Sequence, residues 1–256
     1  MNSFAVVGFG RLGSALGRSL AHAGWKFAGA STRGDTTANI ESDVVFLTVP
    51  DDRIARVAVE RAAQFRTGAA IVHCAGSLGI EVFDDLRASR ADLAIGAFHP
   101  LQTVPLGAPV GVFQGAHAGI DADSHSTRTL LVAIAHALGM STVDVSSTAR
   151  AAYHAAAVVA SNHVTALLGE VERLAAAASV PVSAFEPLAN AAVHNTFSVG
   201  AAAALTGPVQ RGDVKTVALH LSVLRGRDRE LYLVLARAAL ELAVNPSEDM
   251  RRILGA

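Results

Sequence analysis

The 256-residue chain has little of several features that mark particular classes of protein. Cys74 is its only cysteine, so no intramolecular disulfide can form, which is typical of a reducing compartment. The net charge is −1 and no block of basic residues occurs, which argues against nucleic-acid binding. No apolar run is long enough to span a bilayer, and no signal peptide precedes the first apolar segment. We therefore expect a cytoplasmic protein that binds neither nucleic acid nor membranes.

Aromatic residues are also scarce, at 5% of the chain, whereas hydrophobic residues make up 51%. The core must therefore consist largely of Ala, Val and Leu. The length suits one large domain or two modest ones. The mean hydropathy is positive, at +0.38, without a membrane segment. This indicates extensive buried area, and a subunit interface would account for part of it.

The first apolar run leads directly into a glycine-rich turn. Residues 4–7 read Phe-Ala-Val-Val, Gly8-x-Gly10-x-x-Gly13 follows, and a helical pattern continues to residue 22. Between a strand and a helix, this spacing is typical of a dinucleotide-binding loop, although a βα turn without a ligand has the same pattern. We expect Gly8 to permit the tight turn, Gly10 to admit the pyrophosphate and Gly13 to allow close packing. The predicted cofactor contacts of this loop are Gly8, Phe9, Gly10, Arg11, Leu12 and Gly13.

The end of the next strand indicates which dinucleotide binds. The strand at 26–30 ends in Ser31-Thr32-Arg33, where an NAD-selective site carries Asp or Glu for the ribose 2′-hydroxyl. Two hydroxyls and a guanidinium suit a 2′-phosphate instead. We therefore predict NADP(H) rather than NAD(H), with a merely polar turn as the alternative.

The remaining pattern divides the chain into two parts. Short apolar runs alternate with helical patterns up to about residue 145, as in parallel βαβ units, and only helical patterns follow. This predicts an α/β fold, with a Rossmann-like, doubly wound and mostly parallel sheet in residues 1–146 and an all-α domain in residues 147–256. The connection at 33–43 is too short for a full helix. Further strands are expected at 43–49, 70–74, 93–98, 110–113, 116–120 and 141–145, and helices at 53–65, 126–138, 148–178, 182–205, 213–224, 228–243 and 247–254.

Ligands of open α/β sheets bind beyond the carboxyl ends of the strands. Behind the strand at 43–49 we expect cofactor contacts, and behind the strand at 70–74 we expect backbone close to the nicotinamide. His99, behind the strand at 93–98, is a candidate for substrate contact, although a His before Pro can also fix a turn. No cation flanks the Cys74 thiol, which favours a buried structural role over nucleophilic catalysis. The predicted cofactor contacts here are Val49, Pro50, Asp51, Cys74, Ala75 and Gly76.

A polar stripe interrupts the Ala-rich helical pattern at 148–178. His154, Ser161, Asn162 and Thr165 follow at i, i+7, i+8 and i+11, so they share one helix face. Imidazole, hydroxyl and amide groups on one face can protonate and orient a carbonyl oxygen. We predict His154 as acid/base and Ser161 and Asn162 as orienting groups, with helix–helix packing as the alternative. No cluster has metal-ligand spacing, so no metal is expected.

A second polar group precedes the helical pattern at 213–224. Arg211 stands just before a predicted helix N-terminus and is a candidate carboxylate or phosphate anchor. Asp213 is more typical of an N-cap than of a ligand contact. The predicted substrate contacts of this region are Thr206, Arg211, Asp213 and His220.

These motifs together resemble a bacterial family in which a Rossmann-like domain precedes the helical domain of unknown function 2520. The matching stretches are GFGRLGSAL, DVVFLTVPDDRI, VHCAGS, FHPLQT, YHAAAVVASNHVTALL and LTGPVQRGDVKTVALHL. The resemblance implies an NADP-dependent oxidoreductase of the wider group of 6-phosphogluconate dehydrogenase, pyrroline-5-carboxylate reductase and ketopantoate reductase. It also implies a helical domain like the C-terminal domain of 6-phosphogluconate dehydrogenase and a homodimer formed through it.

One position departs from that wider group. Its β-hydroxyacid dehydrogenases and ketopantoate reductases carry a Lys four residues before a helical Asn, and here Val158 precedes Asn162. The usual proton donor is therefore missing, and His154 is the nearest replacement. The leading hypothesis is an NADP(H)-dependent oxidoreductase acting on a small carbonyl or imine compound that bears a carboxylate. Ketopantoate reductase and a non-catalytic NADP(H)-binding regulatory protein are the alternatives, and a reduced deazaflavin also remains open as hydride partner.

Overall fold

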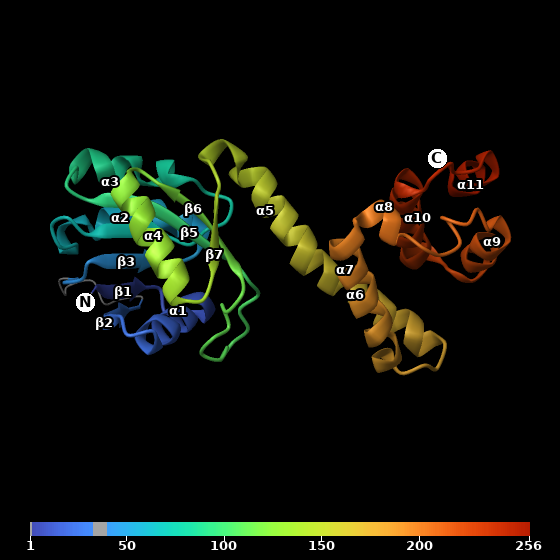
Figure 1. Ribbon diagram of the computed structural model, residues 1–256, viewed down its shortest axis with the longest axis horizontal. Coiled ribbons are helices and arrows are strands. Elements are labelled where there is room, and N and C mark those ends of the chain that lie inside the picture. The colour runs from blue at the N-terminus through green and yellow to red at the C-terminus, as the bar shows by residue number, and fades with distance from the viewer. Residues whose placement is uncertain (1, 33–39) are drawn as a thin grey trace. The chain divides into compact units, whose positions relative to one another are not determined.

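The computed structural model describes residues 2–32 and 40–256, and its contacts divide the chain into two compact units (Figure 1). The first unit is Met1–His163 and the second is Val164–Ala256. The domain boundary expected at residue 146 stays a prediction. Helix α5 (Arg150–Val158) contacts the sheet through Tyr153, which lies against His99 of β5. The start of the helical region thus packs with the Rossmann-like part.

The first unit is built on a seven-stranded sheet with the order β2-β1-β3-β4-β5-β6-β7. All neighbouring strands are parallel except β5 and β6, which run antiparallel. The predicted α/β fold with a mostly parallel sheet is confirmed. The strands are β1 (Ser3–Val7), β2 (Lys26–Ser31), β3 (Val44–Leu47), β4 (Ala70–His73), β5 (Ala94–Leu101), β6 (His117–Ala122) and β7 (Ser141–Asp144).

The strand order creates a switch point beside β1. From β1 the chain first adds β2 on one side and then returns to add β3 on the other side. In open α/β sheets, ligands bind at the carboxyl ends of the strands beside such a switch point. The glycine-rich loop follows β1, so the sheet topology places it at this position.

Alternating side chains of the strands build a core on each face of the sheet. Phe4 and Val6 pack into one buried cluster with residues of α1 and α4, whereas Ala5 and Val7 pack into another with residues of α2 and α3. A period of two is what a strand requires when both faces are covered. The covering helices are α1 (Arg11–His22), α2 (Ile54–Glu60), α3 (Asp84–Ser89) and α4 (His125–Ala137).

Two expected elements of the first unit differ from the structure. The segment 110–113 forms turns rather than a strand, because Pro109 lacks an N–H and Gly111 adopts a positive φ of 91°. The helix expected at 53–65 is shortened to α2, with a 3-10 turn on each side. Most of the connection expected at 33–43 lies outside the described residues.

The second unit is entirely helical, as expected. Its core contains Val217 and Leu221 of α9, Leu240 of α10, and Met250 and Leu254 of α11. The helix expected at 182–205 is divided where the chain turns with a positive φ of 84° at residue 200. The helix expected at 148–178 is continuous but contains a π-helical turn, Val159–His163. The helices are α6 (Val164–Ala177), α7 (Glu186–Val199), α8 (Ala201–Ala204), α9 (Val214–Val223), α10 (Gly226–Leu242) and α11 (Glu248–Leu254).

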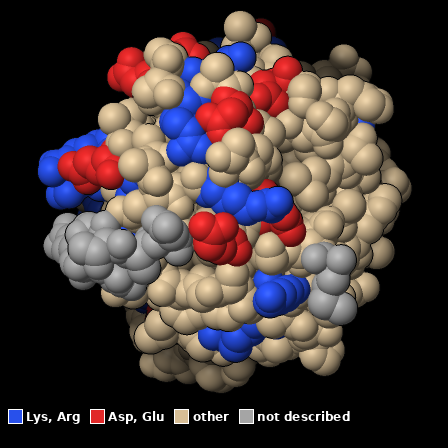
Figure 2. Space-filling model, turned by 90° about the vertical axis from the view of Figure 1, so that its left-hand side faces the viewer, with Lys and Arg blue, Asp and Glu red and all other residues tan. Residues whose placement is uncertain are grey.

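Charges of both signs are mixed on the surface. On the face shown in Figure 2, Lys and Arg side chains lie among Asp and Glu side chains, without a field of one sign. Ion pairs such as Arg128 with Asp144, 2.6 Å apart, contribute to this mixture. In the described ranges 2–32 and 40–256, no helix combines the length and the apolar character needed to cross a bilayer.

Candidate functional site

The glycine-rich loop is held tightly against the end of β3. Gly8 has a φ of 98°, and its N–H donates to the Ser31 carbonyl at 2.9 Å. The carbonyl of Gly8 accepts a hydrogen bond from the Thr48 hydroxyl. A Cβ atom at Gly8 would lie 2.8 Å from the Val49 nitrogen, and one at Gly13 would overlap the Gly8 carbonyl oxygen. The predicted reasons for glycine at both positions are confirmed.

The remaining glycine of the loop faces open space. Gly10 is the N-cap residue of α1, and no described atom lies within 4 Å of the position that its Cβ would take. Among the described residues, no side chain caps the N-terminus of this helix. Its first N–H groups are therefore available to an anion, and the helix dipole adds to the attraction. Phe9 lies against Gly17 and stacks on Phe27, with the ring centroids 6.2 Å apart.

The end of β2 carries hydroxyl groups beside this loop. Ser31 is half-buried, Thr32 is exposed, and Arg33 lies outside the described residues. The Ser31 carbonyl accepts the hydrogen bond from Gly8, so the predicted 2′-position residues begin directly at the glycine loop.

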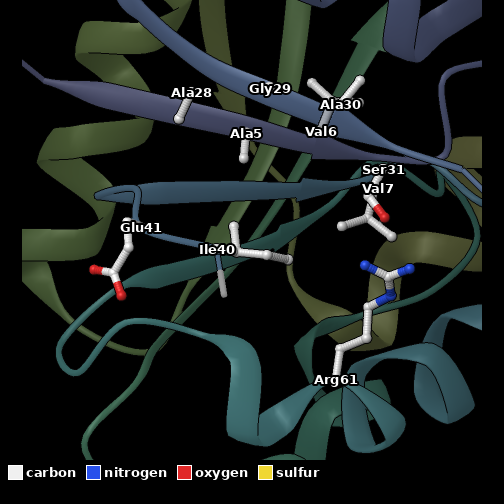
Figure 3. A pocket seen from close by; sticks show the side chains of 10 residues that line it. All are labelled: Ala5, Val6, Val7, Ala28, Gly29, Ala30, Ser31, Ile40, Glu41 and Arg61. Atoms are coloured by element: carbon white, nitrogen blue, oxygen red, sulfur yellow. The ribbon is translucent and has the colours of Figure 1, made fainter. Parts of the chain in front are cut away.

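A small cavity of about 270 Å³ follows β1 and β2 along their length (Figure 3). The Arg61 side chain, 6% exposed, points toward Val7 and Ser31 within it. Pockets that hold small molecules usually measure about 300–1,000 Å³ and, in open α/β sheets, lie beyond the strand ends. This cavity is smaller and lies beside the sheet, so we do not assign it to the cofactor.

His73 fixes the loop that follows β4. Its Nδ1 accepts a hydrogen bond from the Ala75 N–H, and its Nε2 donates to the Gly79 carbonyl, both at 3.2 Å. Burial lowers the pKa of this imidazole to about 4, and the charge of Arg150 lowers it further in the same direction. His73 is therefore neutral near pH 7, with one proton on Nε2.

Cys74 and the loop after β3 complete the predicted cofactor edge. Cys74 is buried, and burial raises the pKa of its thiol far above the usual range. The thiol stays protonated, which agrees with the predicted structural role. Ser77 donates a hydrogen bond to Asp51 at 3.4 Å, which links the loops after β4 and β3. Val49 and Pro50 lie in the same connection, directly behind β3.

Gly76 brings the loop after β4 into contact with two histidines. A Cβ atom here would lie 2.6 Å from Cδ2 of His154 and 2.8 Å from Nε2 of His99. The two imidazole rings meet edge to face, with centroids 5.9 Å apart. Three regions that the sequence placed in the site by separate arguments therefore adjoin one another: the loop after β4, the end of β5 and α5.

These histidines open onto a pocket of about 520 Å³, within the usual size of small-molecule sites. His154, Ser161 and Asn162 line it together, so these three members of the predicted stripe share one face. Thr165 belongs to the second unit. The single hydroxyl proton of Ser161 has two acceptors within reach, the Ala157 carbonyl at 2.7 Å and the side-chain oxygen of Asn162 at 2.9 Å. The lining residues are His99, Pro100, Leu101, Gln102, Thr103, His154, Ala157, Val158, Ala160, Ser161 and Asn162.

Ser161 and Asn162 lie in the π-helical turn. Such turns are rare and often occur at functional sites, because the extra residue in the turn changes where the side chains project. The bond between Ser161 and the Asn162 oxygen directs the amide of Asn162 through a neighbouring hydroxyl. The pocket therefore holds an imidazole pair and an oriented amide.

Two residues of α5 that the sequence analysis did not select adjoin the pocket. The Tyr153 hydroxyl lies 2.8 Å from Nδ1 of His99. Arg150 is 1% exposed, and within the described chain none of its three guanidinium nitrogens has a hydrogen-bond partner. Burial lowers the pKa of Arg150, whereas the charge of Asp121 raises it. The spacing i, i+3, i+4 places both residues on the helix face of His154, which is the signal that could have identified them.

Burial is also the main influence on the titration of His99. It lowers the pKa of this imidazole to about 4, and the charges of His154 and Arg150 act in the same direction. Burial raises the pKa of Tyr153. His99 is therefore a neutral hydrogen-bonding group near pH 7.

The four predicted substrate residues of the second unit have different surroundings. Asp213 caps α9, since its carboxylate accepts from the Thr216 N–H at 3.0 Å and from the Thr216 hydroxyl at 2.7 Å. These two bonds lower the pKa of Asp213. Nδ1 of His220 lies 2.8 Å from the Tyr232 hydroxyl. Arg211 and Thr206 are exposed. The cap is confirmed, and the substrate role of the four residues stays a prediction.

The fold defines a Rossmann-like α/β protein with a helical C-terminal unit. Residues 116–239 match the family model described as "Domain of unknown function (DUF2520)", which confirms the resemblance drawn from the sequence. No curated protein sequence gives a significant match to the chain.

Several solved structures are similar to the whole chain. A "putative NADP oxidoreductase" from Bacteroides fragilis is 23% identical with a TM-score of 0.81, over 94% of this chain and 98% of that one. A protein from Thermotoga maritima is also 23% identical, with a TM-score of 0.68 and the same coverage. Pyrroline carboxylate reductase from Plasmodium falciparum, with NADP bound, is 12% identical with a TM-score of 0.65 over 100% of both chains. At these identities the likeness establishes a shared fold.

Proposed function

We propose that this protein is an NADP(H)-dependent oxidoreductase acting on a small carbonyl or imine compound that bears a carboxylate. The observation that carries the proposal is the order of groups along one edge of the sheet. The ends of β2, β1, β3, β4 and β5 are neighbours in that order, and they carry Ser31, the glycine loop, Thr48, Gly76 and His99. The edge therefore runs from a dinucleotide loop to a pocket with two imidazoles. Two of the similar structures are described with NADP, which supports this reading.

The residues along this edge fit a nicotinamide dinucleotide. The open space at Gly10 and the uncapped start of α1 suit the pyrophosphate. The hydroxyls of Ser31 and Thr32, without a carboxylate beside them, suit a 2′-phosphate. Backbone of the loops after β3 and β4 would adjoin the nicotinamide half. When bound, the nicotinamide exchanges a hydride with the substrate.

The pocket residues would supply the proton and the orientation. We assign the acid/base role to His154, because Val158 stands where the wider group carries its Lys. His99 would contact the substrate, and Ser161 and Asn162 would orient it. Arg211, Thr206 and His220 of the second unit remain the proposed anchors for the substrate carboxylate, with Asp213 holding the helix behind them.

A non-catalytic NADP(H)-binding regulatory protein is the second candidate, and the valine at position 158 favours it. A regulator needs the glycine loop but no acid/base pair, whereas a reductase needs both. Thermal unfolding with a panel of keto acids distinguishes the two, because a ternary complex raises the melting temperature only when NADPH is present. No shift with any keto acid favours the regulator. Ketopantoate belongs in the panel as the substrate of the closest enzymatic alternative.

The first test is a fluorescence titration of the full chain with NADPH and, separately, with NADH. We expect NADPH to bind about tenfold or more tighter, since a 2′-phosphate adds charge-assisted hydrogen bonds. Gly10→Ala should weaken NADPH binding by about tenfold, because its methyl group enters the space left for the pyrophosphate. Gly169→Ala in α6 is the matched control, since its added methyl also meets no neighbour. Binding of neither nucleotide would overturn the proposal.

We also propose that the second unit forms a homodimer. Within the described chain, no residue of α7 is buried, and its apolar side chains include Phe197 at 85% exposed. Glu186 is the one formally charged residue of this helix. Exposed apolar faces of this kind mark interfaces, and a second copy offers a face of the same uncharged character. Light scattering should give twice the chain mass, and Phe197→Glu should reduce it to one. Leu106→Glu in the first unit, at a site 86% exposed, should leave the mass unchanged.

A further inference from the structure

Tyr153 reaches His99 across a glycine. The two rings meet edge to face, at 83° with centroids 5.5 Å apart, and the hydroxyl lies 2.8 Å from Nδ1. Gly119 of β6 is the direct sheet partner of His99, and a Cβ atom there would lie 2.7 Å from Cζ of Tyr153. Only a residue without a side chain at position 119 leaves room for this contact.

The acidities of the Tyr153 hydroxyl and the His99 imidazole determine the direction of the proton between them. The Tyr153 hydroxyl can donate or accept, and Nδ1 of a neutral imidazole accepts unless it carries the ring proton. A phenol is a much stronger acid than a neutral imidazole N–H, and an unprotonated imidazole nitrogen is a stronger base than a phenol oxygen, so Tyr153 is the donor of this bond. Nδ1 of His99 is the acceptor that lies within reach.

The other nitrogen of His99 then carries the ring proton. A neutral imidazole has one N–H, so an accepting Nδ1 leaves the proton on Nε2. Nε2 is the atom that faces Gly76, 2.8 Å from the position of a Cβ there, and His99 lines the 520 Å³ pocket. The N–H group of His99 is thus on the side of the ring that faces Gly76, where the loop after β4 also meets His154.

The groups around His99 keep it uncharged. Tyr153 and His154 contact it from α5, and Arg150 of α5 and His73 of β4 interact with it electrostatically. The positive charge of the buried Arg150 opposes a second proton on His73 and on His99.

We propose that Tyr153 is a positioning residue that holds His99 as the neutral tautomer with its proton on Nε2. In this form His99 donates a hydrogen bond to the carbonyl oxygen or imine nitrogen of the substrate and does not itself transfer a proton. The substrate part of the proposal rests on the proposed function, whereas the tautomer does not. The preorganised neutral donor stabilises negative charge that develops on the oxygen during reduction.

The test is the long-range proton–nitrogen NMR spectrum of the full chain labelled with ¹⁵N-histidine, without cofactor or substrate. We expect the wild-type spectrum to show His99 with an unprotonated Nδ1 and a protonated Nε2. Tyr153→Phe should shift the tautomer ratio of His99 about tenfold toward the Nδ1–H form, which corresponds to the loss of one neutral hydrogen bond. The signals of His99 are identified by their absence in His99→Gln.

The second unit provides a matched control. Tyr232→Phe removes the hydroxyl next to His220 and should leave the His99 signals unchanged. A proton on Nδ1 of wild-type His99, or an unchanged tautomer ratio in Tyr153→Phe, would overturn the proposal. The wild-type spectrum alone decides the tautomer if the variant does not fold. Because no nucleotide is added, a failure of NADPH to bind is recorded separately and bears only on the proposed function.

Discussion

Each of the two units contains a His–Tyr pair, and the two pairs have almost the same geometry. In both, the tyrosine hydroxyl lies 2.8 Å from Nδ1 of the histidine. The ring centroids are 5.5 Å apart for His99 and Tyr153 and 5.6 Å apart for His220 and Tyr232, and the rings are near perpendicular, at 83° and 85°. Geometry alone therefore does not distinguish them.

Their surroundings do. The first pair joins a strand to a helix at the wall of a pocket, next to a second imidazole and a buried guanidinium. The second pair joins α9 to α10, beside the apolar core of the helical unit. A His–Tyr contact can thus join two helices, as in the second unit, or determine which imidazole nitrogen carries the proton, as we propose for His99. The neighbouring charged groups distinguish the two cases.

The largest expected difference between the pairs is in turnover. Once a substrate is known, His99→Ala should lower kcat by about 100-fold to 10,000-fold, the usual contribution of a positioned proton donor or hydrogen-bond donor. His220→Ala should lower it at least about tenfold less, because Nδ1 of His220 is engaged within its own unit. Steady-state reduction with NADPH measures both.

His99→Gln, which keeps an N–H donor, should recover part of the loss and shows that the fold is intact. Equal losses for His99→Ala and His220→Ala would contradict the distinction between the pairs. His220, a proposed anchor of the substrate carboxylate, would then contribute as much to turnover as His99.

A smaller expected effect concerns the pH dependence of stability, which we assign to the first unit. The pKa values of His73 and His99 are lowered to about 4, whereas an unfolded histidine titrates near 6.5. Below pH 6.5 the unfolded chain therefore binds protons that the folded chain does not. The stabilisation is complete above that pH and is lost as the pH falls toward 4, with about 3 kcal/mol from the fully buried His73.

Denaturant unfolding between pH 7.5 and 4.5, followed by the fluorescence of the single tryptophan, Trp25, measures this loss in the first unit. His99→Gln should flatten the curve, because it removes one of the two groups. Carboxylates with a lowered pKa, such as Asp43 and Glu81, have ordinary values of 3.8 and 4.5 and add to the loss only at the acid end of this range, so the change between pH 7.5 and 5.5 reports the histidines. A curve that is flat from pH 6.5 to 4.5 in the wild-type chain would disprove the assignment.

The parts of the site that depend on short sequence patterns were predictable. The spacing of the glycine loop predicted a tight turn at Gly8 and close packing at Gly13, and the structure shows both, whereas the role of Gly10 stays a prediction. The rule that ligands bind at strand ends selected Gly76 and His99, and helical periodicity selected His154. These three arguments are independent, yet the structure brings their residues into contact.

The parts that depend on long-range contacts were not predictable. Tyr153 is 54 residues from His99 in the sequence. No local pattern indicates that the absence of a side chain at Gly119 leaves room for their contact. The contact of α5 with the sheet has the same origin, because Tyr153 meets a strand that is distant in the sequence. The strand expected at 110–113 failed because its valines suggested β structure, whereas the proline and glycines around them require turns.

His73 has a consequence for how fast and how tightly a ligand can bind. Because its two hydrogen bonds hold Ala75 and Gly79, the loop that would receive the nicotinamide keeps its shape before any ligand arrives. Binding then loses little chain entropy at this loop, and a larger share of the contact energy becomes affinity. Association at this loop then requires less rearrangement of the chain, which favours a higher association rate.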